Sequence, residues 1–136
     1  FGHAYSADHV CQLVRKVYEK KVAFHDGDEE IAPGVSLHLI GGHTMGVQCV
    51  RVMTKRGWVV LASDAMHFYE NWQREKPFPI VYNVSDMING FAKMEKLAAS
   101  KQHIIPGHDP LVLKQYPSEK ADTAGIICRL DQAPKG

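Results

Sequence analysis

The sequence predicts a single domain, residues 1–136, of the α/β or α+β class, with short strands and amphipathic helices. Residues 35–40 alternate apolar and polar side chains, which is typical of a strand buried on one face. Residues 86–100 instead place apolar side chains at helical spacing. With 136 residues and 45% hydrophobic content, the chain is long enough to bury a core.

The N-terminal region is expected to hold a helix, a short strand and a turn. Residues 7–20 carry apolar side chains at helical spacing, and Ser6 stands at the N-cap position. A strand is expected at residues 21–24. It is followed by a turn in which Gly27 supplies a positive φ. Within the later strand at 35–40, we expect Val35, Leu37 and Leu39 to share one face and Ser36 and His38 the other.

The middle of the chain predicts a β-hairpin followed by a loop. Residues 47–53 and 58–62 are its strands, joined by a turn at 55–57. The second strand is apolar on both faces, so we expect it to be central in the sheet. Residues 65–79 are rich in aromatic residues and contain two prolines, and we interpret them as a loop or short helix.

The C-terminal half predicts one long helix and two short strands. The helix at 86–100 has Ser85 as its expected N-cap. A strand is expected at 102–105, and an edge strand at 126–130.

Composition excludes several classes of function. The net charge is +1, with 16 basic and 15 acidic residues and no basic run, so nucleic acid is not an expected partner. No apolar stretch reaches 18 residues, so no membrane span is expected. Cys11, Cys49 and Cys128 are odd in number and widely spaced. They are typical of core residues in a reducing compartment, and we expect a cytoplasmic protein.

Three short motifs could hold a metal ion. They are Gly-His-Thr-Met-Gly around His43, Leu-Ala-Ser-Asp-Ala around Asp64, and Ile-Pro-Gly-His-Asp around His108. Each candidate ligand follows an apolar, strand-like run and lies beside a small residue that permits a tight turn. Imidazole and carboxylate groups bind zinc, manganese or iron. Taken singly, the three residues are better explained as a turn residue, a cap and a surface loop residue than as metal ligands. Together, they predict convergence on one metal site.

These motifs resemble, in order, those of the metallo-β-lactamase superfamily of metal-dependent hydrolases. The likeness is greatest to the N-acyl homoserine lactone lactonases, and it includes Pro77 to Val84 and most of the chain from about Ala32 onward. The resemblance implies the C-terminal half of an αββα sandwich, with a mixed sheet and helices on one face. It also implies hydrolysis of an ester or lactone, with a metal-bound hydroxide as the attacking group, and quorum quenching as the activity.

The resemblance further implies how the ligands would be shared. His43 would serve one metal ion, His108 the other, and Asp64 would bridge the two. Zinc is the metal we expect, with two ions in an intact parent site.

Residues near Asp64 are candidates for substrate contacts. His67 and Tyr69 follow it by three and five residues. Related lactonases place a tyrosine at the first of these positions, so either side chain could polarise the lactone carbonyl or orient the substrate. Asp109 could orient a ligand or cap a turn. Phe68, Trp72, Phe78 and Tyr82 could line an acyl-chain pocket, although packing between loop and core is the more common role of such aromatic residues. For His67 and Tyr69, loop packing is an equally good explanation.

One part of the family pattern is missing. The His-x-His-x-Asp-His loop does not occur in the sequence, which begins Phe1-Gly2-His3. We therefore expect a truncated parent protein, inactive alone, whose uncovered sheet face favours a homodimer or higher homo-oligomer. The apolar residues expected on that face are Val35, Leu37, Leu39, Val47, Val59 and Leu61. The alternatives are a thioesterase of the hydroxyacylglutathione hydrolase type and a non-catalytic, self-associating fragment.

Overall fold

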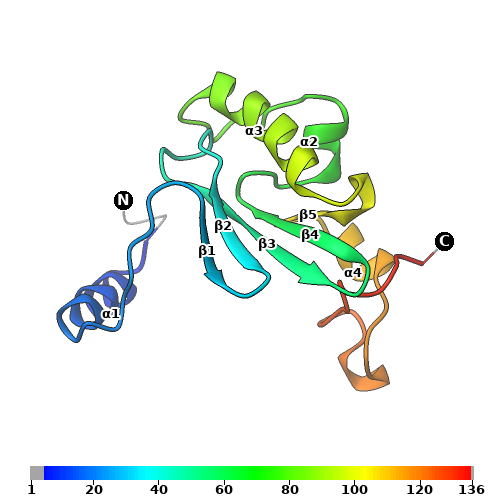
Figure 1. The fold of residues 1–136 in the computed structure, drawn as a ribbon, viewed down its shortest axis with the longest axis horizontal. Helices are drawn as coiled ribbons and strands as arrows, with labels where there is room; N and C mark the ends of the chain where they lie inside the picture. The colour runs from blue at the N-terminus through cyan, green and yellow to red at the C-terminus, as the bar shows by residue number, and fades with distance from the viewer. Residues whose placement is uncertain (1–4, 136) are drawn as a thin grey trace.

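A computed structural model describes residues 5–135, which form a five-stranded mixed sheet with helices (Figure 1). The first four strands pair antiparallel in chain order, and the last pairs parallel to the fourth. This confirms the predicted fold class. The strands are β1 (Glu29–Ala32), β2 (Val35–Leu39), β3 (Gln48–Thr54), β4 (Gly57–Ser63) and β5 (Ile104–Pro106).

The helices differ in how they relate to the sheet. Helices α2 and α3 lie along one side of it, and α1 projects away from it near the N-terminus (Figure 1). The helices are α1 (Ala7–Tyr18), α2 (Tyr69–Gln73), α3 (Val84–Leu97) and α4 (Leu111–Gln115), with 3₁₀ turns at Lys101–His103 and Ala121–Thr123.

The main core lies between the sheet and α3. Helix α3 approaches the end of β2 closely because residue 90 is glycine. A Cβ atom on Gly90 would lie 2.4 Å from Cγ2 of Ile40. This close packing seals the apolar side chains from water. The buried members include Cys49, Val60 and Ala62 from the sheet and Met87, Phe91 and Met94 from the helix.

A smaller cluster covers part of the opposite sheet face. Val59 and Ile105 are buried there beside Tyr116, and the C-terminal Leu130 packs against them. The expected edge strand at 126–130 is wrong, because this segment is irregular. Arg56 binds the carbonyl oxygens of Leu130 and Gln132 at 3.2 and 3.1 Å, so a side chain supplies hydrogen bonds that a strand would take from its neighbour.

Several element boundaries differ from the predictions. Residues 21–24 form no strand, and β1 begins later, at Glu29. Helix α3 begins at Val84, with Asn83 as N-cap accepting a hydrogen bond from the backbone N–H of Asp86. Ser85, the predicted cap, lies inside the first turn. Asn and Ser are both strong caps, so local sequence did not decide between them.

The two faces of β2 are also buried differently from the prediction. Side chains alternate as expected, but the more buried face carries His38, which is only 9% exposed. Val35, Leu37 and Leu39, on the other face, are only partly buried. Of the other residues expected on the uncovered face, Val47 packs against the α3 core, while Val59 and Leu61 belong to the smaller cluster.

The cysteines and the helices bear on two further predictions. All three cysteines are free, and Cys49 is buried, but Cys11 is exposed on α1. The expectation of core cysteines is therefore wrong for Cys11. Among residues 5–135, no helix is both long and apolar enough to cross a membrane.

Candidate metal centre

A glycine pair after β2 shapes the loop that carries His43. Gly41 and Gly42 have φ values of 73° and 91°, which favour glycine. A Cβ on Gly42 would lie 2.6 Å from Cα of Met87, so only glycine lets the loop pass this close to α3. Nδ1 of His43 donates to the carbonyl oxygen of Ile80 at 2.7 Å. Nε2 of His43 is therefore left with the lone pair that a metal ion needs.

The ends of β4 and β5 bring Asp64 and His108 together. The backbones of Ser63 and Gly107 touch so closely that a Cβ on Gly107 would lie 2.4 Å from the Ser63 carbonyl oxygen. The N–H of His108 donates to the carbonyl of His67 at 3.0 Å. As a result, Nε2 of His108 lies 2.7 Å from Oδ1 of Asp64, although 44 residues separate them.

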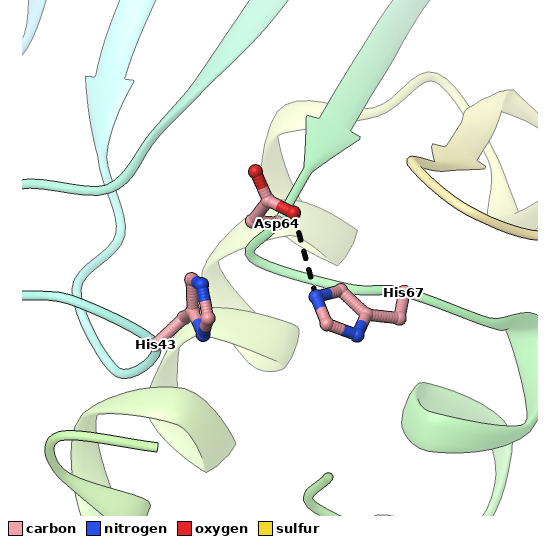
Figure 2. Close-up of side chains that lie close together, drawn as sticks. All are labelled: His43, Asp64 and His67. Carbon is pink, nitrogen blue, oxygen red and sulfur yellow. Dashed lines mark ion pairs between the residues drawn. The ribbon is translucent and has the colours of Figure 1, made fainter. Parts of the chain in front are cut away.

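His67 completes the cluster. Ligand atoms of His43, Asp64 and His67 all lie within 4.8 Å of one another (Figure 2). Nε2 of His67 is 3.4 Å from Oδ1 of Asp64 and makes no hydrogen bond, although the atom is buried. Leaving a buried polar atom unpaired is costly, so an absent partner such as a cation is implied. His67 and His108 also lie together, with ring centroids 4.6 Å apart.

The electrostatics favour the protonation states that bind metal. The hydrogen bond from His108 lowers the pKa of Asp64 and outweighs the opposing effect of partial burial. Burial lowers the pKa of His67, and the nearby His108 lowers it further. Asp64 is therefore an anion and His67 a neutral imidazole at neutral pH, which are the forms that ligate a metal ion. The residues present fit a divalent cation.

Tyr69 and Trp72 lie outside this cluster. Both line a cavity of about 690 Å³ whose lining includes none of the four clustered side chains. Burial raises the pKa of the Tyr69 hydroxyl well above its usual range. Trp72 is 9% exposed and donates from its indole to Glu95 at 2.7 Å. The packing alternative therefore describes Trp72 well.

The remaining aromatic candidates divide into one buried and two exposed residues. Phe78 is 7% exposed and stacks on His67, whereas Phe68 and Tyr82 are 43% and 64% exposed. Tyr82 contributes its backbone N–H, which donates to Gly42 at 2.8 Å and holds the His43 loop. The sequence offers Phe78 as one of several aromatic candidates. Pro77 and Pro79, on either side of it, are the local feature that could have singled it out.

Asp109 caps backbone N–H groups and does not orient a candidate metal ligand. Its Oδ2 accepts from the N–H of Tyr69 at 3.0 Å and its Oδ1 from the N–H of Leu111 at 2.9 Å. This single carboxylate ties the loop after His108 to the start of α2. The turn-capping alternative is the one that the structure contains.

Comparisons with known proteins agree with the motifs. No family model matches the chain. It is 31% identical over 86 residues to the N-acyl homoserine lactonase AiiA of Bacillus thuringiensis subsp. kurstaki, covering 62% of this chain and 34% of that protein. The match to a curated lactonase of Bacillus sp. covers 22% of the relative. The matched part of the chain thus spans between 22% and 34% of the length of these relatives.

Solved structures show the same likeness. An N-acyl homoserine lactone hydrolase with N-hexanoyl-L-homoserine at its catalytic metal centre superposes with a TM-score of 0.61 at 30% identity. The match covers 68% of this chain and 37% of that one. AidC, a dizinc quorum-quenching lactonase, matches in fold with a TM-score of 0.55 at 17% identity, over 74% of this chain and 35% of its own. The predicted resemblance is confirmed.

Proposed function

Since the chain resembles N-acyl homoserine lactonases of the metallo-β-lactamase superfamily in sequence and fold, we propose that it carries metal ligands of a lactone-opening hydrolase. The observation that carries this proposal is the convergence of His43, Asp64 and His108 at three strand ends. Rigid strand ends fix ligand positions, and fixed ligands are what a catalytic metal site requires.

We assign the ligand atoms from the hydrogen bonds. His43 presents Nε2, because its Nδ1 is held by Ile80. Asp64 lies between the imidazoles of His67 and His108, with the same oxygen nearest to both, and this position suits a bridging carboxylate. Bound divalent cations would polarise the ester carbonyl and make water more acidic. Zinc is our proposed metal, supported by the imidazole and carboxylate donors and by the dizinc neighbour of the same fold.

We propose that His67, in preference to Tyr69, acts at the metal centre, where its Nε2 can bind a cation or, when protonated, donate a hydrogen bond to the substrate carbonyl. His67 is in the cluster, neutral at pH 7, and held by the stacked Phe78 ring. Tyr69 faces the other cavity. Phe68 and Tyr82 are exposed and lie near the cluster, so we propose that these two aromatic residues contact the acyl chain of the substrate.

The proposed substrate is a small ester or lactone of the N-acyl homoserine lactone class. The relatives and the solved neighbours named as lactonases support this choice. They give no support to the thioesterase alternative. Opening such lactones would quench quorum signals.

We also propose that the 136-residue chain alone binds metal weakly and turns over slowly, since it supplies only part of the ligand set that the resemblance implies. Metal analysis after dialysis, with a pH-based lactone-opening assay, tests this. We expect slow, zinc-dependent opening of N-hexanoyl homoserine lactone that Asp64→Asn abolishes. The proposed function would be contradicted by faster turnover of an acyl thioester than of the lactone. It would also be contradicted by lactone opening that depends neither on zinc nor on Asp64.

Self-association and location complete the proposal. Helix α1 presents Val10, Leu13, Val14 and Val17 to solvent, at 37% to 54% exposure. Contiguous apolar surface of this kind favours association, so we propose a homodimer that covers it. The three free cysteines support a cytoplasmic location.

A further inference from the structure

A second cluster of polar side chains lies on the α3 side of the sheet and shares no residue with the metal centre. Nε2 of His38 lies 2.9 Å from Oγ of Ser36, and Nδ1 of His38 lies 3.0 Å from Oδ2 of Asp28. An ionised carboxylate only accepts hydrogen bonds, so Nδ1 of His38 carries the proton. Nε2 then accepts from the Ser36 hydroxyl. Serine, imidazole and carboxylate are thus connected in the order used for nucleophilic catalysis.

The strand geometry explains why these groups meet. Ser36 and His38 are two residues apart on β2, so their side chains point to the same face. Asp28 precedes β1 and is held by the N–H of Leu39 at 3.0 Å and by Nζ of Lys93 at 2.8 Å. Partial burial opposes ionisation, but the hydrogen bonds from Lys93, His38 and Leu39 together lower the pKa of Asp28 to about 2. The carboxylate that orients His38 is therefore charged and fixed.

An open cavity of about 340 Å³ gives access to the cluster. Arg51 and Trp58 line it together with Ser36, His38 and Asp28. Two further lining acids are engaged by neighbours: Glu29 pairs with His25 at 2.6 Å, and Glu30 accepts from the N–H of Gly34 at 3.0 Å.

Arg51 is placed to stabilise negative charge beside Ser36. The two residues are directly opposite each other in the β2–β3 register, which brings cross-strand side chains within reach. Nε of Arg51 donates to the Leu97 carbonyl at 2.8 Å, and the guanidinium carbon lies 3.7 Å from the centre of the Trp58 ring. Among residues 5–135, no hydrogen bond engages the terminal nitrogens of Arg51. They can therefore bind an oxyanion that develops in the cavity.

We propose that Ser36, His38 and Asp28 form a second, metal-independent nucleophilic site that hydrolyses short-chain carboxylic esters. Ser36 is the nucleophile, His38 the general base and Asp28 the group that orients it. Arg51 stabilises the oxyanion, and Trp58 forms the apolar wall against the acyl group. A small cavity limits the acyl chain to a short one.

Each step conserves atoms and protons. Oγ of Ser36 attacks the ester carbonyl carbon, and its proton passes to Nε2 of His38. The bond from that carbon to the alcohol oxygen then breaks, and the alcohol leaves with the proton from His38. Water attacks the acyl group on Ser36 and gives a proton to His38. The carboxylic acid departs as Ser36 regains its proton.

A fluorophosphonate ester tests the site directly. Attack by Oγ of Ser36 forms an oxygen–phosphorus bond and expels fluoride, and mass spectrometry of a digest locates the adduct. We would treat the 136-residue chain with this probe in EDTA, so that metal chemistry plays no part. We expect one adduct, on Ser36. We expect labelling to fall at least about 100-fold in His38→Gln, which removes the base but keeps a polar side chain.

Ser100 and His103 provide a matched control within the same chain. Oγ of Ser100 lies 2.7 Å from Nδ1 of His103, but Nε2 of His103 faces the Arg56 carbonyl in place of a carboxylate. Ser100→Ala should leave labelling unchanged. Asp64→Asn should also leave it unchanged, which separates this site from the metal centre.

The outcomes are decisive in either direction. An adduct on Ser36 that is lost in Ser36→Ala and weakened in Asp28→Asn supports the proposal, with circular dichroism confirming that each variant is folded. No adduct on Ser36 in the folded chain, equal labelling of Ser100, or loss of labelling in Asp64→Asn would overturn it. The adduct site in the unmodified chain decides the matter even if His38→Gln does not fold.

Discussion

The imidazole of His67 stacks on the ring of Phe78, with centroids 3.7 Å apart and planes 10° apart. Phe78 is buried, so its ring is held by the core. It therefore fixes the plane of an imidazole whose Nε2 points into the metal cluster. The core thus sets the geometry of the candidate metal centre.

Phe78→Ala is expected to destabilise the fold by about 3–5 kcal/mol, because it removes a buried aromatic ring and leaves a cavity. It should also weaken cobalt binding, since His67 loses its orientation. Urea unfolding and the visible spectrum of bound cobalt measure the two effects. Tyr82→Ala, at an exposed aromatic, is the control and should change stability by less than about 0.5 kcal/mol.

Gly107→Ala should disrupt the junction of β4 and β5. The new Cβ would lie 2.4 Å from the Ser63 carbonyl oxygen, and a backbone atom cannot move aside cheaply. We expect a loss of about 1–3 kcal/mol in unfolding free energy, as overpacking usually costs. Gly46→Ala is matched, because a Cβ there meets nothing within 4 Å. Equal midpoints for both variants in a urea titration would show that the junction is not tight.

His43→Ala should reduce the thermal stabilisation that zinc gives to the chain. A ligand that binds only the folded state raises the melting temperature, and losing a coordinating group weakens binding at least about tenfold. Differential scanning fluorimetry with increasing zinc measures this effect. His9→Ala, on the exposed helix α1, should retain the full shift. A zinc-induced shift that is as large in His43→Ala as in the unmodified chain would remove this residue from the ligand set.

Asp28 should make stability depend on pH in the acid range. Its folded pKa of about 2 lies below the ordinary value of 3.8, so it stabilises the folded state above about pH 4. This contribution is lost as pH falls from about 4 towards 2. Asp28→Asn should therefore lower stability at pH 5 and flatten its dependence on pH below 4. Urea titrations at several pH values test this, and parallel curves for both proteins would contradict it.

Leu13→Glu should reduce self-association without loss of fold. Leu13 lies on the apolar face of α1 and is 54% exposed, so the change removes no buried contact within the chain. Light scattering after size exclusion should report a smaller mass than for the unmodified chain. Gln12→Glu, at an exposed position of the same helix, adds the same single negative charge and is the control. An unmodified chain that is already monomeric would rule out the dimer.

The sequence by itself determined the periodic elements and the order of the ligands. The apolar spacing of α3, the alternation of β2 and the hairpin of β3 and β4 are local patterns. Each lies entirely within one short stretch of sequence, so the sequence alone is enough to predict it. The His43, Asp64 and His108 motifs could be recognised for the same reason.

Only the tertiary structure decided which faces and partners those elements use. The alternation in β2 shows two faces but does not say that α3 buries the one with His38. The contacts of His67 with Phe78, of His43 with Ile80 and of His38 with Asp28 join residues 10 to 37 positions apart. The tail at 126–130 alternates like a strand but forms none, and the side chain of Arg56 binds the carbonyl oxygen of Leu130. Such contacts depend on packing between distant segments, which no local pattern contains.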